Sequence, residues 1–200
     1  MDPGPAPITP GGWGCLDSGP GANFRIWWQL QLPGQKAHAE IVARAMQKNI
    51  WPKLAILMHL DPPSDKGPHH FVGPDGSETV WWDGGDGRLD IYLIVPPPNT
   101  GGAATVAYRP GCDLRPSFVP VDPEMEEDVL LPALAHEFFH TFQFATDVGK
   151  QCAEWKWWSE ATANWALDFV YPENNWEHKI PFATYSAKGG ARRYLRTPMK

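Results

Sequence analysis

Apolar and polar positions in the first half of the chain predict a strand, a long helix and a region of turns. The β-forming residues of Phe24–Leu32 predict a strand. Over Lys36–Asn49, apolar residues recur at steps of four without glycine or proline, which predicts an amphipathic helix. The pattern continues over Trp51–Leu60, past a kink expected at Pro52. Proline, glycine, aspartate and histidine dominate Asp61–Asp86, so we expect a run of turns there.

The second half of the chain contains three short apolar runs followed by two helical patterns. Leu89–Val95 is bounded by glycine and proline and predicts a buried strand, and Ala104–Tyr108 and Ser117–Val121 are weaker strand candidates. Helical patterns follow over Asp128–Thr146 and Trp155–Val170. Strands and helices in this order predict an α+β fold with a mixed sheet.

The last of these helices carries an aromatic stripe. Its members recur at steps of three and four, which is the spacing of a buried helix face, so we expect them to pack in the core. They are Trp155, Trp158, Thr162, Trp165 and Phe169. Trp157 lies off the stripe, and the alternative for this residue is a place in the wall of a substrate subsite.

No internal repeat divides the chain. We expect a Pro/Gly-rich linker over residues 1–22 and one α+β domain over residues 23–172. Residues 173–200 are rich in turn formers and are interpreted as the start of a truncated C-terminal subdomain.

Composition excludes several classes of partner. The chain has 200 residues, 42% of them hydrophobic, and a formal net charge of −6 without any basic run, which argues against nucleic acid and anionic membranes. No apolar run approaches the roughly 20 residues that span a bilayer. The N-terminal residues lack the basic and apolar regions of a signal peptide. Cys15, Cys112 and Cys152 have no metal-ligand spacing and allow at most one disulfide.

Residues 136–140 read HEFFH and carry the candidate chemistry. On a helix, His136 and His140 lie one turn apart on one face, so both rings can reach one metal ion. Glu137 projects beside that face, where its carboxylate can accept a proton from a metal-bound water.

A third ligand is available on the next predicted helix. Glu160 lies twenty residues beyond His140, and two antiparallel helices would bring it back to complete a His/His/Glu site with one open position. The helix around HEFFH is otherwise apolar, and polar side chains are costly there unless something satisfies them. Both observations favour a metal over polar residues placed by chance.

HEFFH, followed at this distance by the glutamate of SEATANW, resembles the gluzincin clan of zinc metallopeptidases. With Gln143 shortly after HEFFH, the chain looks most similar to small secreted bacterial members. The resemblance implies a zincin-like catalytic domain over residues 23–172, with Zn²⁺ as cofactor and peptides or proteins as substrates. It further implies zinc binding by His136, His140 and Glu160, Glu137 as general base, and location outside the cytoplasm.

The resemblance also suggests residues around the metal. Asn164, one turn after Glu160, occupies a position where clan members often have an acidic residue that orients the first histidine. Peptide substrates in such folds lie along an exposed sheet edge, and Ala104–Tyr108 is our candidate edge, which makes Ala104 and Tyr108 candidate substrate-binding residues beside Trp157. No aminopeptidase-type motif for a free amine is present, so an endopeptidase is favoured.

A function from another class is a non-catalytic module that binds protein or carbohydrate and carries a degenerate zinc site. Its support is the aromatic content, since the chain has 11 tryptophans. Measured zinc content and peptidase activity distinguish this module from the peptidase.

Overall fold

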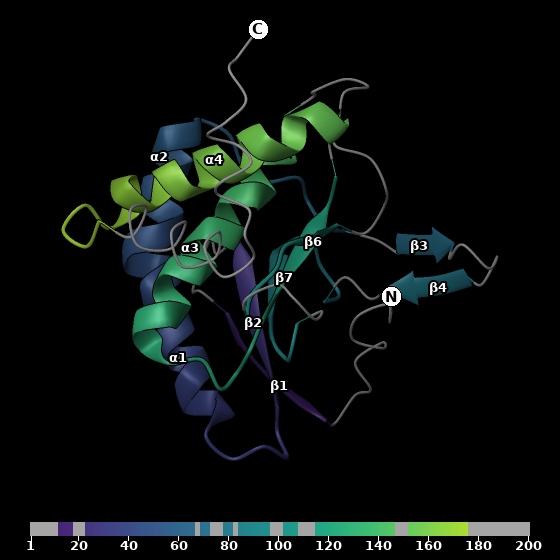
Figure 1. Cartoon of the computed structure of the whole chain (residues 1–200). Coiled ribbons are helices and arrows are strands. Elements are labelled where there is room, and N and C mark those ends of the chain that lie inside the picture. Colours follow the sequence, from purple (N-terminus) through teal and green to yellow (C-terminus); the bar gives the residue numbers. More distant parts are fainter. Residues whose placement is uncertain are drawn as a thin grey trace, which may run out of the picture.

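A five-stranded sheet with helices on one of its faces makes up most of the structure (Figure 1). The computed structural model describes residues 12–17, 23–66, 69–72, 78–81, 84–96, 102–107, 115–146 and 152–175. The strand order is β1-β2-β5-β7-β6. Their bounds are β1 Trp13–Asp17, β2 Phe24–Gln29, β5 Leu89–Leu93, β6 Val106–Ala107 and β7 Ser117–Val121. The fold is therefore α+β with a mixed sheet, as the order of the elements predicted.

The three central strands run parallel, and an antiparallel strand lies at each edge. β2 pairs in parallel with β5, and β5 with β7. β1 pairs antiparallel with β2, and β6 antiparallel with β7. Parallel neighbours require a crossover between them, and the helices between β2 and β5 supply it.

The helical layer consists of α1 (Gln35–Ala45), α2 (Trp51–Met58), α3 (Glu127–Gln143) and α4 (Cys152–Val170). A π-helical turn, Met46–Ile50, joins α1 to α2, and the Trp51 N–H bonds the Met46 carbonyl five residues back. In an α-helix the ring of Pro52 would collide with the carbonyl four residues earlier, so the wider turn lets the chain pass through the proline. The kink expected at Pro52 is thus a local widening of one long helix.

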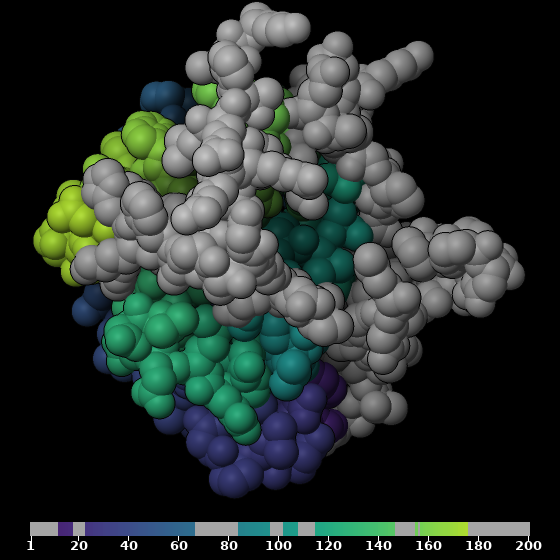
Figure 2. Space-filling view, viewed as in Figure 1, coloured from purple at the N-terminus to yellow at the C-terminus, as the bar shows by residue number. Residues whose placement is uncertain are grey.

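The core lies between the sheet and the helices because side chains alternate along each strand. Ile26 on β2, Ile91 on β5 and Val119 on β7 face the helices and are fully buried. Phe138 and Phe142 of α3 pack against them from the other layer. In the space-filling view, α1 and α3 form adjoining parts of one surface, and the C-terminal part of α4 lies above them at the left (Figure 2). Within the described residues, no helix is long and apolar enough to cross a membrane.

The expected burial of the aromatic stripe on α4 is wrong. Trp158, Trp165 and Phe169 are 45%, 54% and 40% exposed. The face of α4 that enters the core is lined instead by Ala163, Ala166, Leu167 and Val170. Small side chains let α4 approach its neighbours closely, and the bulky indoles remain outside.

Two further expectations are corrected. The region expected to contain only turns includes an antiparallel hairpin of β3 (His69–Val72) and β4 (Glu78–Trp81). The expected linker over residues 1–22 includes β1, which pairs with β2 along all five of its residues. In both cases the pairing partner supplies hydrogen bonds that a short segment cannot form alone.

A buried carboxyl group lies on the sheet face opposite the helices. Asp90 of β5 accepts a hydrogen bond from the Trp27 indole N–H at 2.7 Å and one from the Tyr92 hydroxyl at 3.0 Å. Gly84 packs so closely, with φ +68°, that a Cβ there would lie 2.5 Å from an Asp90 oxygen. Burial raises the pKa of Asp90 to about 7, against the opposing effect of the two hydrogen bonds and of the Arg25 charge.

Asp90→Asn should remove a pH-dependent loss of stability. The pKa of Asp90 is raised on folding, so between its ordinary value of 3.8 and about 7 the folded state binds more protons than the unfolded state. The contribution of Asp90 to stability is therefore greatest below about pH 4 and falls as pH rises to about 7, by on the order of 4 kcal/mol. Asparagine keeps an acceptor for Trp27 and does not ionise.

Urea unfolding of the wild type and of Asp90→Asn at about pH 5 and about pH 8 measures this effect. The variant should gain stability relative to the wild type at the higher pH, because only the wild type then carries a buried charge. An equal difference between the two proteins at both pH values would contradict the assignment.

Candidate metal centre

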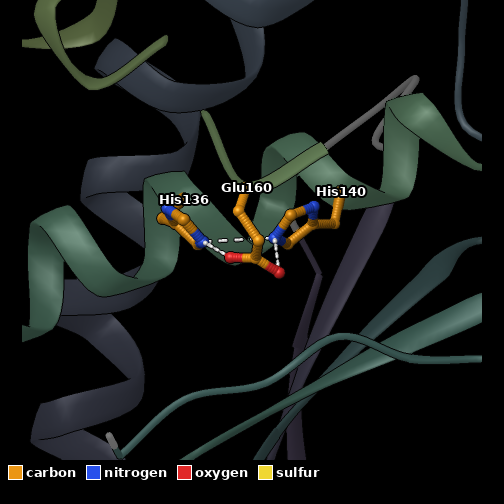
Figure 3. A group of neighbouring side chains, drawn as sticks. All are labelled: His136, His140 and Glu160. Carbon is orange, nitrogen blue, oxygen red and sulfur yellow. Dashed lines mark hydrogen bonds and ion pairs between the residues drawn. The ribbon is translucent and has the colours of Figure 1, made fainter. Parts of the chain in front are cut away.

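Two histidines of α3 present their ring nitrogens to the same point. His136 and His140 lie one helical turn apart, and their Nε2 atoms are 3.1 Å apart. Both side chains project from the same face of α3, as Figure 3 shows. The apolar residues beside them, Phe138 and Phe139, are buried in the core and fix the rotation of the helix. The i, i+4 geometry expected from HEFFH is therefore present.

Glu160 of α4 completes the group. Its Oε2 lies 3.3 Å from His136 Nε2 and its Oε1 lies 3.8 Å from His140 Nε2 (Figure 3). The ligand atoms of the three side chains all lie within 4.8 Å of one another. The packing of α3 against α4 brings Glu160 to two histidines that precede it by twenty and twenty-four positions in the sequence.

These distances fit a tetrahedral ion. Two ligand atoms about 2.05 Å from a zinc ion, at a tetrahedral angle, lie about 3.3 Å apart. The separations from Glu160 to His136 and between the two histidines, 3.3 and 3.1 Å, are close to this value, and the third is 3.8 Å. Two nitrogens and one carboxylate are the ligand set of a catalytic zinc site with one position left for water. The residues therefore fit zinc.

Gln143 orients His140. The His140 Nδ1 lies 2.6 Å from Gln143 Oε1, and Ser159 Oγ donates to the same oxygen at 2.7 Å. The Gln143 amide donates in turn to the Ser159 carbonyl and to Thr162 Oγ1, which fixes which end of the amide faces the ring. The network places the proton on Nδ1 and leaves the Nε2 lone pair for a metal. No role was predicted for Gln143 in the site, although its place three residues after His140 puts it beside that ring.

Burial lowers the pKa of His140, with the nearby His136 adding to the effect. The neutral form of the ring is favoured as a result. Neutral imidazole is also the form that ligates a metal, so the site is electrostatically prepared for a cation.

Glu137 is partly buried, and its carboxylate interacts electrostatically with two of the three candidate ligands, His140 and Glu160. Thr105, which precedes β6, lies with its Oγ1 3.0 Å from Glu137 Oε2 and also bonds the Glu137 backbone carbonyl. Burial raises the pKa of Glu137, while His140 and Thr105 act in the opposite direction. A carboxylate with a raised pKa, next to a metal position, is suited to accept and return a proton.

Comparisons with protein-family models, curated proteins and solved structures found no match to this chain.

The other residues predicted for the site are not part of the His136–His140–Glu160 group. Asn164 donates its amide to the Glu160 carbonyl at 2.8 Å, and no described hydrogen bond joins it to His136. Trp157 is 61% exposed, three residues before Glu160. Ala104 is buried and donates its N–H to the Pro120 carbonyl. Tyr108 lies outside the described residues.

Among the cysteines, Cys15 is a free and exposed thiol. Cys112 and the side chain of Cys152 lie outside the described part of the chain.

Proposed function

We propose that this protein is a zinc-dependent peptidase. The observation that carries the proposal is the convergence of His136, His140 and Glu160 at separations that fit a tetrahedral ion, with Glu137 beside them. A bound zinc ion lowers the pKa of a coordinated water and polarises the carbonyl of a substrate.

The chain's own residues supply the proton transfers. Glu137 accepts a proton from the attacking water and donates it to the leaving amine. His140 is held in position by Gln143 and Ser159, so the ligand geometry is set before substrate binds. The buried phenylalanines of α3 lie on its core side and fix which face of the helix packs inward.

The arrangement around the site supports a zincin-like architecture. β6 is the antiparallel edge strand of the mixed sheet, and Thr105 connects it to α3 at Glu137. An extended peptide can add to such an edge through main-chain hydrogen bonds, and Thr105 connects this edge to Glu137. We therefore assign peptides as substrates, with an endopeptidase favoured.

A binding function is the second candidate, and the exposed aromatic residues of α4 favour it. Trp157, Trp158 and Trp165 present indole surface on the helix that carries Glu160. Exposed tryptophans often contact ligands. Such a module would bind through these side chains and would not need Glu137.

The test uses the full chain after reconstitution with zinc. We expect one equivalent of bound zinc by elemental analysis, and cleavage of a quenched-fluorescence peptide library. Cleavage should stop when a chelator removes the metal and return when zinc is added. A zinc-loaded protein that cleaves no better than Glu137→Gln would overturn the peptidase and favour the binding module.

A further inference from the structure

One side chain connects the edge of the sheet to the general base. Residues 103–107, here called the edge segment, run antiparallel to β7: Ala103 bridges Val121, and Val106 and Ala107 pair with Phe118 and Ser117. Thr105 lies in the middle of this segment. Its Oγ1 lies within hydrogen-bond distance of both the carboxylate and the backbone carbonyl of Glu137.

The alternation of side chains explains why Thr105 faces α3. Val106 packs on Phe118, on the sheet face away from the helices. Ala103, three residues earlier, belongs to the core on the helix side. Side chains of successive strand residues point to opposite faces, so Thr105 shares the face of Ala103. Its hydroxyl is held against α3 by the register of the strand.

The backbone N–H and carbonyl of Thr105 point outward from the sheet edge, away from β7. The Ala104 N–H donates to the Pro120 carbonyl at 3.1 Å, and the Gly102 carbonyl accepts from the Asp122 N–H at 2.8 Å. In an antiparallel pair, residues alternate between bonding the partner strand and turning outward. Thr105 is therefore an outward residue, and within the described residues β6 has β7 as its one neighbouring strand.

We propose that Thr105 is a positioning residue that holds Glu137 in place throughout the proton transfer. The inference rests on the proposed peptidase function. A hydroxyl has one proton and two lone pairs. When Glu137 is a carboxylate, the Thr105 hydroxyl donates to Oε2. When Glu137 carries the proton taken from the water, the hydroxyl donates to the Glu137 carbonyl and accepts from the carboxylic acid.

Between these two states the Thr105 hydroxyl changes only the direction of its hydrogen bonds. No covalent bond of Thr105 forms or breaks. The proton from the water passes to Glu137 and then to the leaving amine, while Thr105 keeps its own proton. Because the same residue turns its backbone to the sheet edge, a peptide strand paired there is also fixed in register with Glu137. Loss of the hydroxyl should therefore lower kcat more than it raises KM.

Zinc-loaded Thr105→Val and Thr105→Ser test the proposal. Valine has nearly the same shape without the hydroxyl, and we expect kcat to fall about 10- to 100-fold with KM nearly unchanged. Serine restores the hydroxyl and should stay within about 3-fold of the wild type. Thr146→Val is the matched control, because it makes the same change just after α3, outside the edge segment and the metal site. In a Glu137→Gln background, Thr105→Val should have no further effect.

A second readout does not depend on turnover. In metal-free protein labelled at glutamate carboxyl carbons, the Glu137 resonance, assigned with Glu137→Gln, should move in Thr105→Val and not in Thr146→Val. Suppose that the wild type cleaves peptides, and that Thr105→Val has the wild-type kcat and an unchanged Glu137 resonance. The role of Thr105 is then overturned, and the peptidase proposal stands. If zinc-loaded wild type cleaves nothing, the peptidase and the role of Thr105 fall together.

Discussion

Glu137→Gln should reduce peptide hydrolysis by roughly 10²- to 10⁴-fold and leave zinc bound. The amide has the size of the carboxylate and can still bond Thr105, so the local packing is kept. It cannot accept a proton from the attacking water, and the leaving amine then departs without a proton donor. The loss should appear in kcat, because the interaction is made in the transition state.

Steady-state kinetics on one cleaved peptide, with zinc content measured on the same sample, checks this expectation. Glu126→Gln, a change at a glutamate that precedes α3, is the control for loss of a negative charge near the same helix. A Glu137→Gln protein with full zinc occupancy and wild-type kcat would refute the assignment of the general base.

Removal of a metal-binding histidine should cause the second large effect, a loss of zinc affinity. His136→Ala or His140→Ala leaves two protein ligands, and we expect zinc affinity to fall on the order of 10³-fold, since a few kcal/mol are lost with each metal bond. Activity should disappear with the metal. His140→Ala also leaves Gln143 and Ser159 without their ring partner, so its loss of stability should exceed that of His136→Ala.

Competition against a chromophoric chelator measures the affinities. His59→Asn is the control, because His59 is exposed at the end of α2 in a left-handed conformation that asparagine tolerates. Wild-type zinc affinity in His136→Ala would show that the metal, if present, binds elsewhere.

The sequence predicted those elements whose signal is local. β7 has the predicted bounds, Ser117–Val121, because its five buried residues, four of them apolar, lie between turn formers. The helix around HEFFH was expected from its apolar residues, and α3 differs from the expected range by one residue at the start and three at the end. A local periodicity is sufficient where a segment buries its own pattern.

The wrong predictions share a cause, which is the absence of information about partners. α4 contains two apolar stripes at helical spacing, one of large aromatic residues and one with Ala163, Ala166 and Leu167. Periodicity cannot choose between them, and the core accepted the smaller side chains. β1 is stabilised by pairing with β2, and β3 and β4 are stabilised by pairing with each other. The residues of a single strand do not reveal such a partner.

Some contacts of the candidate site could likewise be predicted from local spacing, and others could not. The spacing of HEFFH predicted the contact between His136 and His140, and the approach of Glu160 followed from two helices packed side by side. Thr105 precedes Glu137 by 32 residues and meets it through the sheet register, so no local pattern could reveal that contact. Gln143 lies close enough to His140 to be noticed, but a glutamine after a histidine is too common to indicate an orienting role.

The three candidate ligands come from two helices, α3 and α4, which also contact each other through Gln143, Ser159 and Thr162. α4 enters the core with few and mostly small side chains, and residues 144–151 connect it to α3. A zinc ion held by both helices would therefore act as a removable cross-link. By mass action, free zinc at 100 times its dissociation constant adds about 2.7 kcal/mol to the folded state. The zinc supply of the surroundings would then set how firmly α4 stays docked, and with it how long the protein survives proteolysis.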